Sequence, residues 1–203
     1  MEINSSFYRQ HKRAVYERWA GAVPEQFRFS VKLPRAITHD QALVAADVLL
    51  DVFLDEVSGL GPALGALLVQ LPASQPFVAE IVDEFLVTIR ERFTGPVVME
   101  PRHPAFFTAT AEKLLLEHRV TLVAADPACV PEAAAPGGWP GITYYRWHGS
   151  PRMYWSSYDD ERLRALASAL GASGAPGNAW CIFDNTASGA AAANALTLQR
   201  IME

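Results

Sequence analysis

The segment Phe27-Arg28-Phe29-Ser30-Val31-Lys32 decides the fold. Its apolar residues recur with a period of two, which is typical of a β-strand that buries one face. We expect Phe27, Phe29 and Val31 to pack on helices, while Arg28, Ser30 and Lys32 share the other face. A proline-containing loop and a helical pattern follow, so the segment predicts one strand–loop–helix unit.

Similar apolar runs recur along the chain, each followed by a helical pattern or a polar loop. The predicted strands are residues 1–7, 27–33, 64–71, 97–102, 121–126, 142–148 and 180–185. The predicted helices are residues 12–21, 39–57, 77–93, 105–119, 161–170 and 189–201. Residues 127–141 are rich in proline and glycine and predict a loop over one face. Alternation of strand and helix is typical of a parallel sheet covered by helices, either open or closed as a barrel.

Composition limits the classes of protein to which the chain can belong. Its 203 residues, 50% hydrophobic and 19% charged, predict one folded domain spanning residues 1–203. The longest apolar stretch, residues 60–71, is interrupted by glycine and proline and is too short to span a membrane. Cys129 and Cys181 form neither a disulfide framework nor a metal knuckle. With no secretory signal at its start, the chain is expected to be cytoplasmic.

The net charge disfavours nucleic-acid binding, and the absence of glycine-rich motifs disfavours nucleotide binding. The net charge of −5 argues against bulk electrostatic binding to nucleic acid, although a local basic patch stays open as an alternative. Neither a G-x-G-x-x-G fingerprint nor a phosphate-binding Walker loop occurs in the sequence. No organic cofactor is therefore predicted.

Every predicted strand ends in a polar residue. These are Asn4, Lys32, Gln70, Arg102, Asp126, His148 and Asn185. In (β/α) barrels the active site lies at the carboxyl ends of the strands, and such a ring of residues is what that site requires. The alternative is that strands end in polar residues because loops begin there, or that the ionisable side chains form a paired structural network.

Several segments resemble, in order, the domain of unknown function 72 family, also called YecE-like. They are residues 2–8, 27–32, 37–39, 64–72, 100–103, 145–149 and 183–186. The resemblance runs from end to end and implies a TIM-type barrel, but it implies no established activity. Its members usually carry Asn at the position of Asp184, so a role carried over to that position is in doubt.

The resemblance also implies an incomplete barrel. Members usually have a Gly-Trp motif, a strand and a helix before the strand that contains Glu2 and Asn4, whereas Met1 here falls directly on that strand. We therefore expect an N-terminally truncated, open barrel of seven parallel strands. Its two unpaired edges would favour self-association or a covering partner.

Small residues follow the last two predicted strands and predict an anion site. The residues concerned are Gly149, Ser150, Ser188, Gly189 and Ala190. Loops after strands seven and eight and a helix N-terminus form the recurrent phosphate site of TIM barrels. The alternative is that they only cap the helix and pack closely.

Glu100, Arg102 and His103 form the densest titratable cluster in the sequence. Arginine favours the ionised form of a neighbouring carboxylate, so Glu100 could act as a base while Arg102 clamps an anionic group. Equally, the two could simply neutralise each other. His148, near Arg146, suits a neutral acid/base or a metal ligand.

A divalent metal stays open as an alternative. Carboxylate and imidazole side chains suitable for zinc or manganese occur at Glu100, His103, Asp126, His148 and Asp184. Their spacing matches no compact metal motif, so no metal ligand is assigned.

The sequence thus favours a barrel that binds a small anionic, phosphorylated molecule and uses general acid/base chemistry. Candidate catalytic residues are Glu100, His148 and His103. Candidate substrate-binding residues are Asn4, Lys32, Gln70, Arg102, Asp126, Arg146 and Asn185. The alternatives are a nucleic-acid phosphodiester binder or metal-assisted nuclease, and a non-catalytic binding module; the sequence does not decide whether the chain is an enzyme.

Overall fold

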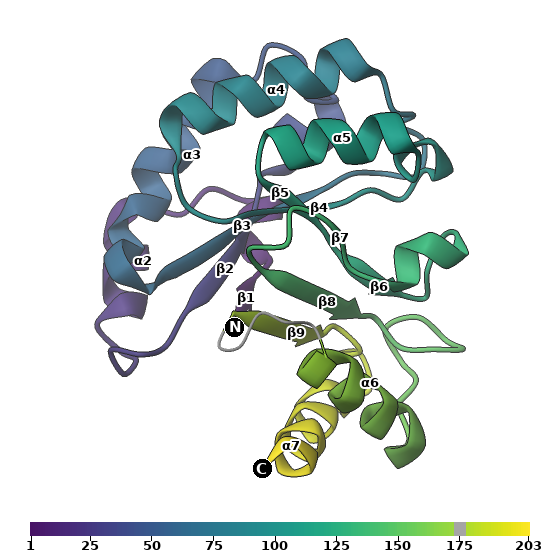
Figure 1. The fold of residues 1–203 in the computed structure, drawn as a ribbon. Coiled ribbons are helices and arrows are strands. Elements are labelled where there is room, and N and C mark those ends of the chain that lie inside the picture. Colours follow the sequence, from purple (N-terminus) through teal and green to yellow (C-terminus); the bar gives the residue numbers. More distant parts are fainter. Residues whose placement is uncertain (173–177) are drawn as a thin grey trace. The chain divides into compact units, whose positions relative to one another are not determined.

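The computed structural model describes residues 1–172 and 178–203. The chain divides into two compact units, Met1–Val120 and Thr121–Glu203 (Figure 1). Each unit combines parallel strands with helices, as the alternating pattern in the sequence predicts.

The first unit contains a parallel sheet. Its strands, in spatial order, are β1 (Glu2–Ile3), β2 (Phe29–Lys32), β3 (Leu64–Gln70) and β4 (Val97–Glu100). The register aligns Lys32 with Leu68 and Gln70 with Glu100. Lys32 and Gln70 therefore stand at the carboxyl ends of their strands as expected, and Glu100 stands where Arg102 was expected.

Five α-helices belong to the first unit in the described part of the chain. They are α1 (Ser5–Tyr8), α2 (Arg13–Ala20), α3 (Asp47–Val57), α4 (Ala79–Arg92) and α5 (Ala109–Glu117). Short helical turns are η1 (Ala36–Asp40), η2 (Ser58–Ala63) and η3 (Pro104–Phe106). Figure 1 shows α3, α4 and α5 on the same side of β3 and β4.

The core of this unit explains why β3 is an almost continuous apolar run. Residues 66–69 are all 0% exposed, although neighbouring residues of a strand point to opposite faces, so both faces of β3 are covered. Phe53 of α3 and Leu86 and Ile89 of α4 are buried as well. Burial of these apolar side chains is the main force that holds helices and sheet together.

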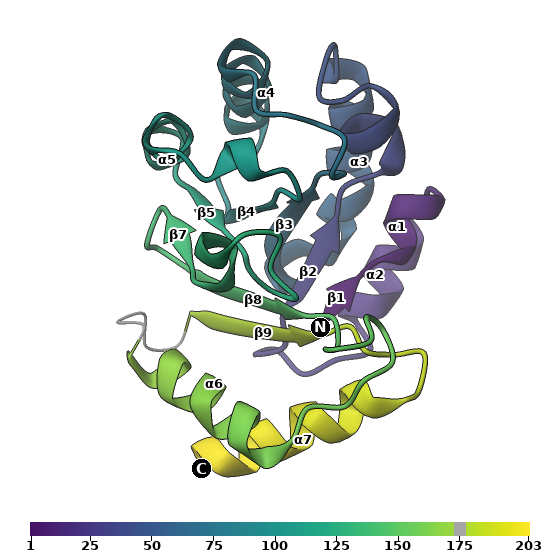
Figure 2. The same ribbon diagram turned by 90° about the vertical axis from the view of Figure 1, so that its right-hand side faces the viewer.

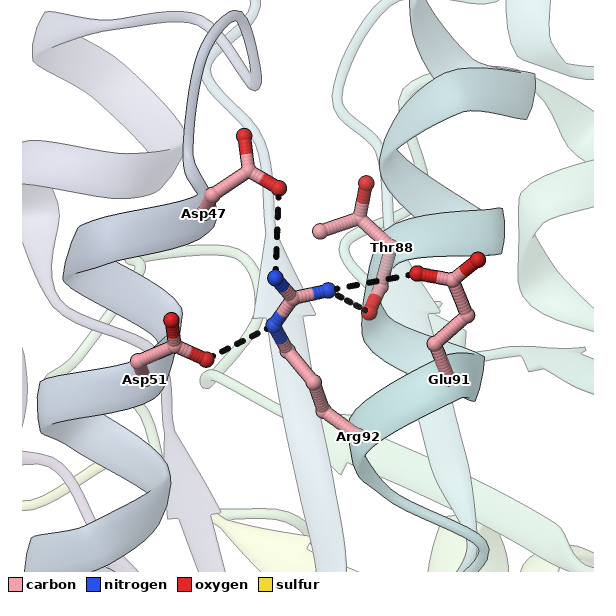
Figure 3. Close-up of polar contacts among 5 residues, drawn as sticks. All are labelled: Asp47, Asp51, Thr88, Glu91 and Arg92. Carbon is pink, nitrogen blue, oxygen red and sulfur yellow. Dashed lines mark hydrogen bonds and ion pairs between the residues drawn. The ribbon is translucent and has the colours of Figure 1, made fainter.

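Arg92 connects α3 to α4 on the surface (Figure 3). Its Nε lies 2.7 Å from Oδ1 of Asp51, and its Nη2 lies 3.4 Å from Oδ1 of Asp47. Its Nη1 donates to the carbonyl of Thr88 at 3.0 Å and faces Glu91 at 3.4 Å. These acceptors raise the pKa of the Arg92 guanidinium, with the hydrogen bond to Asp51 as the largest cause.

The second unit contains a parallel three-stranded sheet and an antiparallel pair. The sheet has the order β6 (Ala124–Asp126), β8 (Thr143–Trp147), β9 (Ala179–Phe183). The antiparallel pair joins β7 (Gly137–Gly138) to β5 (Val120–Leu122), which starts at the last residue of the first unit.

Two long helices cover the sheet of the second unit. Figure 2 shows α6 (Asp160–Ala172) and α7 (Ala190–Met202) side by side against β8 and β9. Their shared core contains Leu163, Leu166 and Leu198 with Tyr145 and Tyr158. A further turn, η4 (Pro131–Ala134), lies between β6 and β7.

Several sequence-based boundaries were wrong. The predicted strand 1–7 is only β1, because α1 begins at Ser5, and the predicted strand 97–102 ends at Glu100. The predicted strand 121–126 is two strands, β5 and β6, with Val123 between them. The predicted loop 127–141 contains η4 and the antiparallel strand β7, because a pair of glycines lets the backbone approach β5. The predicted helix 39–57 begins only at Asp47, since η1 precedes it and Ala42 and Leu43 have positive φ of 49° and 75°.

The fold is therefore a mixed α/β fold with mostly parallel sheet. Strand pairing within residues 1–172 and 178–203 does not form a closed ring, so a closed barrel is not shown. Over the same residues, no helix combines the length and the apolar character that crossing a membrane requires.

Candidate functional site

The carboxyl ends of β6, β8 and β9 bring polar side chains to one edge of the second unit. Parallel pairing aligns Asp126 with Trp147, and Trp147 with Phe183. The ladder continues past the strands, because the amide of His148 donates to the carbonyl of Asp126 at 2.7 Å. The amide of Asp184 likewise donates to the carbonyl of Trp147 at 2.8 Å.

Asp184 joins two of the predicted residues. One of its oxygens, Oδ2, lies 3.1 Å from Nδ1 of His148 and 3.5 Å from Nη2 of Arg146. His148 and Arg146 are 1% and 2% exposed, whereas the Asp184 side chain is 22% exposed. When Nδ1–H donates to Asp184, the other ring nitrogen, Nε2, is the acceptor, which is the tautomer a general base needs.

Asp184 is the residue that sequence reasoning left out of the site. The signal was available, since it follows directly on β9 beside the predicted Asn185. From the sequence, Asp184 was considered only as a type of metal ligand, yet a carboxylate also orients a histidine in a way that an amide does not.

Asp126 has both carboxylate oxygens occupied. Tyr158 donates its hydroxyl to Oδ2 at 2.6 Å, and Arg162 donates from Nη2 to Oδ1 at 2.8 Å. The Arg162 guanidinium also lies 5.5 Å from the ring centre of Trp147. Burial, and then the bond to Asp126, raise the pKa of Tyr158. This side of the edge is a satisfied hydrogen-bond network that fixes the loop after β8.

Asn185 is fully buried and connects the loop after β8 to α7 by hydrogen bonds. Its Nδ2 donates to the carbonyl of Ser156 at 2.9 Å and to Oδ1 of Asn194 at 2.8 Å. Asn194 in turn accepts from the amide of Tyr158 at 3.2 Å and donates to its carbonyl at 3.0 Å. Oδ1 of Asn185 has no hydrogen-bond partner among the described residues.

The residues of the predicted phosphate site already have partners of their own. The Gly149 amide donates to the Tyr158 hydroxyl at 2.8 Å, and the Ser188 hydroxyl donates to the carbonyl of Trp155 at 2.6 Å. The Gly189 amide donates to the carbonyl of Thr186 at 3.0 Å. Ala190 is the first residue of α7, and Ser150 is partly exposed. The phosphate site stays a prediction.

The remaining predicted residues lie in the first unit. Nη2 of Arg102 lies 2.6 Å from Oε1 of Glu100, which is only 1% exposed. The side chain of Gln70 donates to the carbonyl of Leu71 at 2.7 Å. His103 accepts from the amide of Ala105 through Nδ1 at 3.1 Å, so its side chain caps η3.

Phe7 brings Lys32 and His39 together. Nζ of Lys32 lies 3.9 Å from the ring centre of Phe7, and the His39 ring centre lies 4.9 Å from it. Burial is the largest cause that lowers the pKa of His39, followed by the charge of Lys32. Asn4, at the end of β1, borders an apolar hollow described below.

No three histidine, cysteine, aspartate or glutamate side chains lie close enough together to hold a metal ion in the part of the chain that the structure describes. The five side chains considered as metal ligands therefore do not form a cluster of this kind.

One protein family and two curated proteins match this sequence. The family model described as "Protein of unknown function DUF72" matches residues 1–203. The "UPF0759 protein YecE" of Escherichia coli K12 is 35% identical over 117 residues, which are 57% of this chain and 42% of that protein. The protein of the same name from Escherichia coli O157:H7 matches to the same extent.

Solved structures of the same family share the fold. A DUF72 family protein from Enterococcus faecalis V583 matches with a TM-score of 0.83 and 22% identity, covering 99% of this chain and 83% of that one. A DUF72 family protein from Thermotoga maritima MSB8 matches with a TM-score of 0.80 and 23% identity, over 99% and 83% of the two chains.

Proposed function

The chain belongs to the DUF72 family of proteins of unknown function, and we propose that it binds a small anionic, phosphorylated molecule and exchanges a proton with it through His148. The observation that carries the proposal is the cluster of His148, Asp184 and Arg146 at the carboxyl ends of β8 and β9. We further propose that the strands belong to the open, TIM-type barrel expected from the sequence, with this cluster at its carboxyl end.

The chemistry follows from the three side chains. Asp184 holds the imidazole through Nδ1 and stabilises the imidazolium that forms when Nε2 takes a proton. Arg146 brings a permanent positive charge to the same carboxylate, which suits binding of an anionic group next to the histidine. In the first unit, we propose Glu100 and His103 as proton-transfer residues and Lys32 and Arg102 as anion-binding residues, as a separate group whose contribution variants would test.

A thermal-shift screen tests the proposal on the whole chain. The probes are inorganic phosphate and a set of phosphorylated metabolites, because a ligand that binds only the folded state raises the melting temperature in proportion to occupancy. A rise with at least one probe is expected for the natural chain. No rise with any of them contradicts the proposal.

Variants then locate the site. Arg146→Met and Arg146→Lys should lose the thermal response, and Arg146→Lys keeps a charge in case Arg146→Met folds poorly. Arg164→Met is the matched control, since the Arg164 side chain is 66% exposed on α6 and pairs with Asp160. His148→Gln should retain binding and lose turnover of any ligand found. Full response in Arg146→Lys and in Glu100→Gln would show that the ligand binds elsewhere.

The same samples separate the alternatives. Binding of DNA with a steep dependence on salt would favour the phosphodiester binder, and cleavage that requires added Mn²⁺ would favour the nuclease. Binding without turnover in any variant would favour a non-catalytic binding module.

A further inference from the structure

Ser5 and His11 form a close pair in the first unit. Ser5 Oγ lies 2.8 Å from Nε2 of His11, within hydrogen-bond distance. A serine hydroxyl beside an imidazole is the arrangement that activates serine as a nucleophile. Neither residue belongs to the site proposed above.

The imidazole is held in place by aromatic rings. The ring centres of Tyr16 and Trp19 lie 5.8 Å and 5.2 Å from that of His11, both edge-on. His11 is only 8% exposed. Burial, and then the charge of Arg9, lower the pKa of His11, which favours the neutral form of its ring.

Ser5 borders an apolar hollow of about 370 Å³. The hollow is lined by Met1, Glu2, Ile3, Asn4, Ser5, Trp19, Ala22, Val23 and Phe29. Its volume falls in the range of small-molecule sites, and its walls are mostly hydrocarbon. Such a hollow accepts an apolar chain and offers little to a charged group.

Asn4 adds a polar group at the same hollow. Its Oδ1 is buried and has no hydrogen-bond partner among the described residues. Buried polar atoms are normally paired, so this carbonyl oxygen is suited to a ligand group that donates a hydrogen bond.

We propose that Ser5 and His11 form a nucleophile–base pair that hydrolyses esters of short apolar carboxylic acids, with the acyl chain in the hollow. Ser5 Oγ forms a bond to the ester carbonyl carbon while its proton passes to Nε2 of His11. The bond from that carbon to the alcohol oxygen then breaks, and the alcohol leaves with the proton. Water attacks the acyl-Ser5 in the same way, which releases the carboxylic acid and restores the hydroxyl.

Covalent labelling tests the proposal directly. The natural chain is treated with an alkyl fluorophosphonate, and the labelled residue is identified by peptide mass spectrometry. Label on Ser5 is expected. No label, or label on another residue, overturns the proposal.

Hydrolysis of p-nitrophenyl butyrate supplies the second readout. Ser5→Ala and His11→Gln should each lower kcat/KM at least tenfold. Ser58→Ala is a control on the surface, and Ser6→Ala removes a buried hydroxyl that donates to the carbonyls of Ile3 and Lys32. Both controls should keep the activity. Unchanged activity in Ser5→Ala or His11→Gln overturns the proposal.

A pocket variant tests where the acyl chain lies. Ala22→Phe fills the hollow without touching the pair, so it should reduce hydrolysis of the butyrate ester more than that of the acetate ester. An equal effect on both esters contradicts the placement of the chain. Arg164→Met, at an exposed position of α6 in the second unit, should leave the hydrolysis unchanged.

Discussion

Nδ1 of His148 lies 3.1 Å from Oδ2 of Asp184, the carboxylate oxygen that also faces Nη2 of Arg146 at 3.5 Å. A nearly buried histidine and a nearly buried arginine thus share one acceptor that reaches the surface. Removal of the negative charge affects both side chains at once.

Asp184→Asn is expected to lower the free energy of unfolding by about 1–3 kcal/mol, because a hydrogen bond between charged groups weakens at a buried site. Urea denaturation measures the change. Asp160→Asn is the control, since Asp160 is 67% exposed and its pair with Arg164 contributes little. Equal effects of the two substitutions would show that Asp184 is no more than a surface charge.

Tyr158→Phe is expected to destabilise the chain by about 1–3 kcal/mol as well. The Tyr158 hydroxyl donates to Asp126 at 2.6 Å and accepts from the Gly149 amide at 2.8 Å, so its loss leaves that amide without this acceptor. Tyr8→Phe is the matched control, because Tyr8 is 80% exposed. A melting temperature as high as that of the natural chain would contradict the importance of this network.

The strand ends could be predicted from the sequence because they depend on local pattern. Lys32, Gln70 and Asp126 are the last residues of their strands, since apolar runs end where polar residues begin, whereas β4 ends at Glu100 and not at the predicted Arg102. The break at Val123 could not be predicted, because 121–126 is apolar on either side of it and only tertiary pairing decides where β5 ends.

The site was harder to predict than the strands. Arg146 and His148 were proposed for the site from their position in the sequence. Asp126 was predicted to bind a ligand, and in the structure its two oxygens accept from Tyr158 and Arg162. Those partners are 32 and 36 residues away in the sequence, and no local pattern indicates such pairs. Likewise, the Ser5–His11 contact depends on how α1 meets the following turn rather than on a motif.

Replacing Gly149 and Gly171 by alanine should change the free energy of unfolding in opposite directions. Gly149 has φ of +95°, and a Cβ there would lie 3.0 Å from the carbonyl oxygen of Ser156 and 3.1 Å from Cβ of Asn185. Gly149→Ala should therefore cost about 1–3 kcal/mol in the free energy of unfolding. Gly171→Ala, in α6 with nothing within 4 Å, should stabilise by about 0.4–1 kcal/mol. Both are measured by urea denaturation, and a stabilising Gly149→Ala would contradict the backbone argument.

The contribution of Arg92 to thermal stability should depend on the salt concentration. The guanidinium faces Asp47, Asp51 and Glu91 at the surface, and such attraction is screened as ionic strength rises. Arg92→Gln should therefore lower the melting temperature more at about 0.05 M NaCl than at about 1 M NaCl. Arg164→Gln, which removes a single exposed pair, should show a smaller difference. A loss that does not change with salt would mean that the bond to the Thr88 carbonyl dominates.

Two histidines of the first unit, the buried His11 and the partly buried His39, predict how the stability of the chain depends on pH. Burial is the largest cause that lowers the pKa values of His11 and His39 below 6.5, so the unfolded chain binds protons more readily than the folded one. Their contribution to stability is therefore complete above pH 6.5 and is lost as the pH falls from 6.5 through the lowered folded values. Urea denaturation between about pH 5 and 7.5 should show the free energy of unfolding falling toward acid.

His39→Gln should reduce this slope, because the glutamine does not titrate. The charge of Lys32 contributes to the shift at His39, so Lys32→Met in the natural background should reduce the slope in part. Stability that rises toward acid over this range, or a slope that His39→Gln leaves intact, would show that the imidazole beside Phe7 accepts a proton without cost to the fold.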